Sequence, residues 1–195
     1  MKPKGFLIVL AQPEPVFEEE FNAWYDTEHL PERLAVPGFE TARRYVCLDG
    51  APKYLAVYDT ESAAVLDTPA YLSVSFDNAS PWTRRVTGRG RIYRSAGEQV
   101  YPGGALTRPC ARLLLVRLRG VPEQAGEAVV AGMRANFEAL PQTLQVRVFA
   151  HDDGDGAFDL LGMAEAGAPL PTALDLSAFG RYAHAIDLVN TYAPY

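Results

Sequence analysis

The segment VYPGGALTRPCARLLLVRL, residues 100–118, decides how the chain is organised, because it divides two stretches with the same order of patterns. Its turn residues, Pro102 to Gly104, follow one complete run of strand-like and helix-like patterns. Its second part, residues 111–118, is an apolar run typical of a buried strand, and the same order begins again there. The sequence therefore predicts an internal repeat, with a boundary near residues 101–109.

The first copy follows the order strand, helix, strand, strand, helix, strand. Phe17, Phe21 and Trp24 fall at i, i+4 and i+7 and mark the apolar face of its first helix, which Pro31 is expected to end. Asp49-Gly50 is a hairpin dipeptide between the second and third strands. The expected elements are a strand at 5–11, a helix from Val16 to about Leu30, strands at 39–49 and 52–60, a helix from Glu61 to about Val74 and a strand at 85–95.

The second copy repeats this order. Its expected elements are a strand at 111–118, a helix at 123–140, strands at 143–152 and 157–166, a short helix from Thr172 to about Tyr182 and a strand at 185–192. Helices on one face of a four-stranded sheet leave the other face apolar, and two such sheets in one chain can cover each other. We therefore expect an α+β protein of two ferredoxin-like βαββαβ repeats, with antiparallel sheets packed as a fused dimeric α/β barrel. Residues 1–103 form the first repeat, which carries the candidate site, and residues 104–195 form the second, which closes the barrel.

Composition excludes several classes of protein. The formal net charge is −6 and the sequence pI is about 5.1, whereas a nucleic-acid binder normally has a basic surplus. The basic cluster from Arg84 to Arg94 is better explained as the polar side of a strand. The apolar run Phe6–Ala11 is shorter than the core of a signal peptide, and no segment approaches the length of a membrane span. These features predict a cytoplasmic protein that binds neither nucleic acid nor membrane.

Nothing in the sequence predicts a metal site. Cys47 falls inside an expected strand and Cys110 at the start of another, without metal-ligand spacing, so buried free thiols are expected. The segment HDDGDGAFD, residues 151–159, is superficially like a calcium loop but lacks its ligand spacing and is expected to be a hairpin loop. The three histidines are scattered, and His184 is expected at the surface.

The first helix carries the most informative polar residues. Glu28 falls within its apolar stripe, and Tyr25 and His29, four residues apart, share the flank of that stripe. An ionisable residue on an apolar face is costly unless it has a partner, so these side chains are expected where the core meets a cleft. There a neutral imidazole could take a proton, with a neighbouring carboxylate fixing its tautomer. Alternatively, Glu28 lies beyond the last regular turn and His29 only caps nearby carbonyls.

The stretch WYDTEHLPERLAVPGFETARRY, residues 24–45, contains a Trp-Tyr pair, a His-Leu-Pro, a Pro-Gly-Phe and an Arg-Tyr. With YLAVYDTES (54–62) and PAYLSVSFDNASPWTRRV (69–86), it resembles the EthD-like branch of the dimeric α/β barrel superfamily. Relatives in that superfamily include cofactor-free monooxygenases, polyketide cyclases, decarboxylases, lactone isomerases and haem-degrading enzymes. The likeness covers the first half of the chain; in the second half only the order of strands and helices agrees.

The resemblance implies that His29 is the general acid/base, with Tyr25 beside it in the cleft. Arg44 and Tyr45 lie on the next strand, where one should face the helices and the other the opposite sheet. Aromatic residues that could wall a pocket for a flat ligand, or could simply pack the core, are Trp24, Tyr71 and Trp82. In the second copy Met133 aligns with His29, so only the first copy is expected to carry chemistry.

These residues predict a cofactor-free enzyme that uses His29, with Tyr25 and Glu28, for acid/base chemistry on a small hydrophobic, aromatic or polyketide-like molecule. Cyclisation, isomerisation, dehydration, decarboxylation and monooxygenation all fit the pattern. Two alternatives stay open: a non-catalytic binding protein for a hydrophobic metabolite, and a haem-binding or haem-degrading protein with His29 as axial ligand. A fused tandem can be a monomer, although exposed sheet edges also allow a homodimer.

Overall fold

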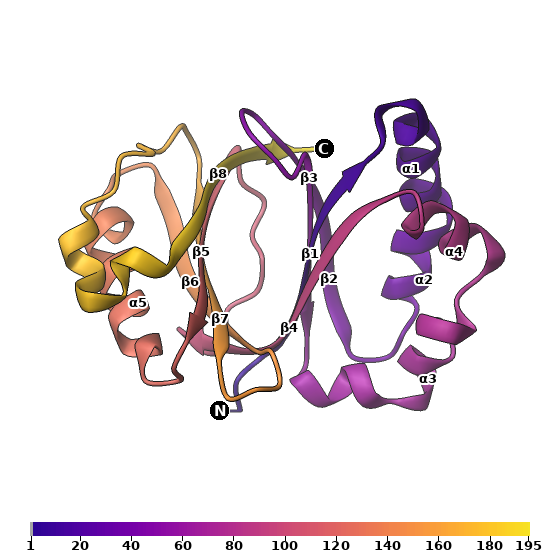
Figure 1. Cartoon of the computed structure of the whole chain (residues 1–195), viewed down its shortest axis with the longest axis horizontal. Helices are drawn as coiled ribbons and strands as arrows, with labels where there is room; N and C mark the ends of the chain where they lie inside the picture. Colours follow the sequence, from indigo (N-terminus) through magenta and orange to yellow (C-terminus); the bar gives the residue numbers. More distant parts are fainter. Residues whose placement is uncertain (1) are drawn as a thin grey trace.

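The structure, a computed structural model that describes residues 2–195, is built around a closed barrel of eight antiparallel strands (Figure 1). The strands are β1 Gly5–Pro13, β2 Phe39–Cys47, β3 Tyr54–Thr60, β4 Gly90–Tyr101, β5 Arg112–Val121, β6 Thr143–Asp152, β7 Phe158–Ala166 and β8 Ile186–Pro194. Around the barrel they run in the order β1, β3, β2, β8, β5, β7, β6, β4. Each half of the chain thus supplies four strands in the order fourth, first, third, second, which confirms the predicted α+β barrel of two ferredoxin-like repeats.

The helices cover the outside of the barrel, those of the two halves on opposite sides (Figure 1). The first half contributes α1 Glu18–Trp24, α2 Leu30–Leu34, α3 Pro69–Leu72 and α4 Pro81–Thr87, and the second contributes α5 Ala125–Met133 and a 3-10 segment at Leu176–Ala185. The two halves of the barrel join where β2 pairs with β8 and β4 pairs with β6. Within residues 2–195, no helix combines the length and apolarity that a membrane crossing needs.

Side chains alternate between the barrel interior and the helix layers, so three separate apolar clusters form. The interior holds one face of each sheet, including Phe6, Tyr45 and Phe149, whereas each helix layer packs on the outer face of its own sheet. Strand β3 is buried along its whole length because both of its faces are covered. Arg44 faces the helices and Tyr45 the interior, as their alternation predicts.

Pro31 was predicted to end the first helical stretch, but the stretch continues past it to Leu34. Between α1 and α2 the chain makes a π-helical turn, Tyr25–His29, in which the Leu30 amide donates to the Tyr25 carbonyl, five residues back. Proline lacks the N–H that a regular helix would use and its ring crowds the preceding turn. Pro31 lies just after the wider π turn, in the first turn of α2, so the helical stretch continues beyond it.

The second helical stretch of the first half also differs from the prediction. Instead of one helix from Glu61 to Val74, the chain forms 3-10 segments at Ala63–Asp67 and Phe76–Asn78 together with α3 and α4. The helices α3 and α4 each begin with a proline after a hydroxyl cap, Thr68 and Ser80 respectively. Because α4 extends to Thr87, the expected strand at 85–95 starts only at Gly90, and the first arginines of the basic cluster lie on a helix.

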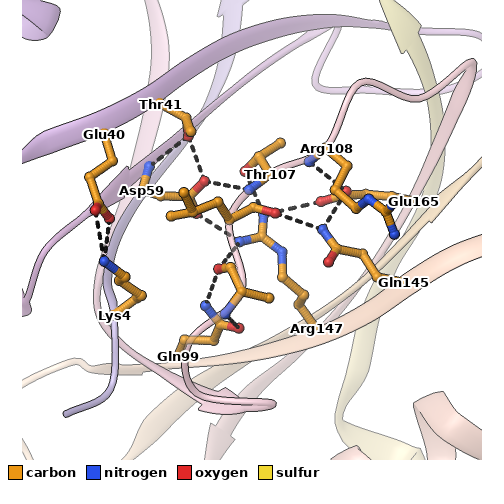
Figure 2. A network of polar contacts seen from close by, with 12 residues as sticks. Lys4, Glu40, Thr41, Asp59, Gln99, Thr107, Arg108, Gln145, Arg147 and Glu165 are labelled. Atoms are coloured by element: carbon orange, nitrogen blue, oxygen red, sulfur yellow. Dashed lines mark hydrogen bonds and ion pairs between the residues drawn. The ribbon is translucent and has the colours of Figure 1, made fainter. Parts of the chain in front are cut away.

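A buried ion network joins the two halves inside the barrel (Figure 2). Arg147 of β6 is fully buried and pairs with Asp59 of β3 at 2.7 Å and with Glu165 of β7 at 3.1 Å. The segment between β4 and β5 completes it: the Thr107 amide donates to Asp59 at 2.6 Å, and the Arg108 amide donates to Glu165 at 2.9 Å. Burial alone would raise the pKa of both carboxyl groups. For Asp59, the Arg147 guanidinium and the hydrogen bonds outweigh burial, and the pKa is lowered. For Glu165, burial outweighs the same kinds of contact, and the pKa is raised.

Candidate active site

The π-helical turn gathers three aromatic rings under the first-half sheet. Trp24 and His29 are stacked with ring centroids 4.3 Å apart, and the Tyr25 ring meets that of His29 edge-on at 5.2 Å. All three side chains are buried. A π turn has more residues per turn than an α-helix, and such turns occur frequently at functional sites. Tyr25 and His29 therefore lie on one face of the helical stretch, as expected.

These rings border a cavity of about 200 Å³ between the helices and the outer face of the first-half sheet. Leu7 and Val9 of β1 form its floor, and residues from the 3-10 segment at 76–78 and from α4 close its sides. Its polar and aromatic walls come from Trp24, Tyr25, His29, Arg33, Tyr71, Ser75, Thr83, Arg84 and Arg94. The cavity thus has aromatic surfaces and hydrogen-bonding groups together, which is the usual character of a small-molecule site.

His29 is the only histidine on these walls, and its side chain is 9% exposed. Its Nδ1 is buried and has no hydrogen-bond partner among residues 2–195. Burial, together with the positive charges of Arg33 and Arg44, lowers the pKa of His29 to about 3. The imidazole is therefore neutral at neutral pH and is able to accept a proton. Burial also raises the pKa of Tyr25, so its phenol stays protonated as a donor.

Acid is expected to destabilise the wild-type protein more than a His29→Phe variant. The unfolded histidine binds a proton below about pH 6.5, whereas the folded one resists protonation until about pH 3. The stability that this group confers is therefore complete above pH 6.5 and falls as the pH approaches 3, a loss of up to about 2–3 kcal/mol near pH 4.5. Urea unfolding near pH 7.5 and near pH 4.5 measures it for both proteins. Equal losses in the two would contradict the assignment.

Within residues 2–195, the Glu28 carboxylate makes no hydrogen bond or ion pair with the His29 ring. Its carboxylate accepts hydrogen bonds from Ser80 at 2.5 Å and from Thr83 at 3.1 Å, both on or just before α4. Thr83 in turn accepts a hydrogen bond from the indole of Trp24 at 2.9 Å. Glu28 thereby fixes α4 and the tryptophan on which His29 stacks. Glu28 thus acts on the His29 ring only through Thr83 and Trp24. The predicted contact, in which a carboxylate fixes the imidazole tautomer, is not made by Glu28.

Two of the other predicted site residues lie away from the cavity on β2. The Arg44 guanidinium lies 4.4 Å from the centre of the Tyr25 ring and pairs with Asp26 at 2.6 Å, but Arg44 does not line the cavity. Tyr45 points into the barrel interior. Both border a different hollow of about 330 Å³, near the C-terminal residue Tyr195.

Of the three aromatic residues predicted as pocket walls, Trp24 and Tyr71 line the cavity and Trp82 does not. Tyr71 of α3 lines the His29 cavity. Trp82 of α4 is turned away from it, and its indole donates to Glu20 at 3.2 Å. The cavity thus brings together Trp24, Tyr25, His29 and Tyr71 of the predicted site.

Several polar wall residues were missed in the sequence: Arg33, Ser75, Thr83, Arg84 and Arg94. Arg33 is 5% exposed, lies 5.1 Å from the centre of the Tyr71 ring and donates to the Val74 carbonyl at 3.1 Å. Arg94 of β4 donates to the Tyr71 hydroxyl at 3.4 Å. Ser75 is buried, and its hydroxyl has no partner among residues 2–195. Arg33 follows His29 by four residues, a spacing that places both on one helix face and was visible in the sequence.

The second half has no comparable set of polar groups at the position of His29. Met133 is fully buried there and packs over Gly162, where an added Cβ would meet its Cγ and Sδ at 2.5 Å. Among residues 2–195, potential metal ligands and thiols are likewise not gathered into a site. Within residues 2–195 no group of three or more potential metal ligands occurs, and the two cysteines are free and half-buried, less covered than expected. His184 is exposed, as predicted.

Comparison with solved structures places this fold among known barrels. Over its whole length the chain is similar to an anthrone oxidase-like protein, with a TM-score of 0.69, 14% identity and 92% of that chain covered. It is also similar to a haem-binding protein from Thermus thermophilus (TM-score 0.51, 10% identity, 100% of this chain and 92% of that one). A chlorite dismutase from Candidatus Nitrospira defluvii gives a TM-score of 0.52 at 8% identity, over 98% of this chain and 91% of the other. Neither a protein-family model nor a curated protein matches the sequence. The chain thus has the dimeric α/β barrel fold, folded here from a single polypeptide.

Proposed function

We propose that the chain is an enzyme that uses His29 for acid/base chemistry on a small aromatic carbonyl compound, without help from a cofactor. The observation that carries this proposal is a buried, neutral imidazole with an unpartnered ring nitrogen on the wall of an aromatic cavity. Buried polar groups are normally hydrogen-bonded, and exceptions call for an explanation. The Trp-Tyr and His-Leu-Pro motifs support an EthD-like enzyme of this superfamily.

The size of the cavity limits the substrate. An apolar cavity of roughly 150 Å³ is enough to bind benzene, and the His29 cavity measures about 200 Å³. A single substituted ring fits that space between Trp24 and Tyr71. A three-ring ketone such as anthrone, suggested by the anthrone oxidase-like structure, exceeds it.

The proposed step is proton transfer at a carbon next to a carbonyl. The imidazole of His29 accepts the proton, and the electron pair of the C–H bond passes into an enolate whose oxygen takes the negative charge. Burial is the main cause of the low pKa of His29, and the positive charges of Arg33 and Arg44 add to it. The negative charge of the enolate would offset the effect of the two arginines, so the imidazole becomes more basic as the enolate forms. Return of the proton to the substrate completes the cycle.

Deuterium exchange tests this function without knowledge of the natural substrate. The protein, incubated in D₂O with phenylacetone, acetophenone or anthrone, is expected to speed incorporation of deuterium next to the carbonyl of the single-ring ketones. Proton NMR follows the loss of the C–H signal. Ketones that bind, seen as shifted signals of the cavity residues, but are recovered without deuterium would favour a binding protein over an enzyme.

Haem binding is the remaining alternative, since one similar structure is of a haem-binding protein. The residues present do not fit haem. His29 is stacked against Trp24, and the cavity beside it, at about 200 Å³, lies below the roughly 300 Å³ at which pockets for drug-sized ligands begin. A Soret band that appears on adding haemin and is lost in His29→Ala would revive this alternative.

A further inference from the structure

The walls of the His29 cavity carry a local excess of positive charge, even though one of their arginines, Arg33, pairs with Glu32 outside the walls at 3.8 Å. They include three arginines, Arg33, Arg84 and Arg94, and no aspartate or glutamate. This occurs on a chain whose formal net charge is −6. The adjoining groove along β4, of about 1040 Å³, shares Phe76 and Arg94 with the cavity, yet its other charged walls are mostly carboxylates. The positive set is therefore local to the cavity.

Two of these guanidinium groups have free donors. Among residues 2–195, neither Arg84 nor Arg94 has a carboxylate within ion-pair distance; Arg84 donates to the Asp77 carbonyl at 3.2 Å and Arg94 to the Tyr71 hydroxyl at 3.4 Å. Neighbouring arginines of the same cluster behave differently, since Arg85 and Arg89 both pair with Glu20. An arginine fork is well suited to a carboxylate, which it can bind through two parallel hydrogen bonds.

A second observation points to a ligand independently of charge. The Ser75 hydroxyl, on a side chain that is 3% exposed, and His29 Nδ1 are both buried on the cavity wall without a partner among residues 2–195. Tyr71 lies close to the arginines, with Arg33 over its ring and Arg94 at its hydroxyl. The residues that carry these two unpaired polar atoms thus line the same cavity as Arg84 and Arg94, which have no carboxylate partner among residues 2–195.

We infer that the cavity takes an aromatic ligand bearing an anionic group, a carboxylate above all, which Arg94 binds beside Tyr71 with Arg33 close by. This inference rests on the proposed function for the cavity as the substrate site and narrows its substrate to aromatic acids. The ring lies against Trp24 and Tyr71, and the anion lies toward the mouth, where Arg94 is exposed. A neutral ligand of the same shape would leave the guanidinium without a partner.

Benzoate and benzamide test the inference, because they share a shape and differ in charge. Calorimetric titration of the wild-type protein is expected to show benzoate binding about tenfold more tightly than benzamide, the contribution of one charge-assisted hydrogen bond at a partly exposed site. The Arg94→Met variant should lose that preference. The matched control is Arg91→Met, an exposed arginine of the same strand that does not line the cavity, and it should keep the preference.

Three results would overturn the inference: equal affinity for the two probes, no binding of either, or the same loss of preference in both variants. None of these binding results would contradict the acid/base proposal if deuterium exchange into phenylacetone still depends on His29. Conversely, a selective loss of benzoate binding in Arg94→Met, with no exchange activity at all, would mean an anion-binding site without the proposed chemistry. The two proposals therefore fail separately.

Discussion

Replacing Arg147 with methionine is expected to lower the free energy of unfolding by about 3–5 kcal/mol. The guanidinium is fully buried inside the barrel and is the cation nearest to two buried carboxylates, those of Asp59 and Glu165. Without it, both carboxylates stay in a region of low dielectric with too few donors. Breaking a buried ion pair from one side costs far more than the pair itself contributes.

Urea unfolding monitored by circular dichroism measures this loss. Arg134→Met is the matched control, because Arg134 pairs with Glu138 on an exposed helix face, where solvent screens the pair, and its loss should change stability far less. A triple variant with Asp59→Leu, Arg147→Met and Glu165→Leu should recover most of the loss, since apolar residues of similar volume need no counter-charge. If Arg147→Met were no less stable than Arg134→Met, the network would have no role in holding the barrel together.

Replacing His29 with alanine is expected to lower the rate of deuterium exchange by about 10²–10⁴-fold, the usual contribution of a positioned general base. The substrate ring would still find Trp24 and Tyr71, so binding of the ketone should fall much less than exchange. The rate for the folded protein is measured by proton NMR with phenylacetone, after the thermal midpoint of the variant has been compared with that of the wild type.

Two controls separate chemistry from packing. His184→Ala removes an exposed histidine of the second half and should leave exchange unchanged. His29→Gln keeps a polar side chain of similar reach but cannot accept a proton at neutral pH, so it should be as slow as the alanine variant. Exchange in His29→Ala within about threefold of the wild-type rate would rule out His29 as the base.

The repeat, and with it the barrel, could be predicted because strand alternation and helix periodicity are local properties of the chain. The opposite directions of Arg44 and Tyr45 follow from the same alternation. Pro31 was misjudged because its effect depends on the wider turn before it, which local rules for proline do not anticipate. The starts of α3 and α4 were missed, although Thr68-Pro69 and Ser80-Pro81 are ordinary helix beginnings.

Apart from Tyr71 of α3, the predicted residues that line the cavity share the first helical stretch. Tyr25 and His29 lie together because they are four residues apart, and Arg33 repeats that spacing. Arg94 and Ser75 come from a strand and a loop that the tertiary fold brings to the cavity, so no local pattern marks them. Glu28 and Trp82 were assigned to the pocket from their residue type, but each instead makes hydrogen bonds that hold α4 to the helical stretch.

The peptide that joins β4 to β5 has a consequence for how such a barrel can arise. Its amides at Thr107 and Arg108 serve as fixed donors to one carboxylate from each half. A barrel assembled from two separate copies of one repeat has no such joining peptide, and would have to satisfy these buried acids in another way. In this single chain the joining peptide therefore does more than tether the two halves, because its backbone amides are part of the barrel interior. Because each half has its own sequence, His29 in the first half can correspond to Met133 in the second, which two identical copies would not allow.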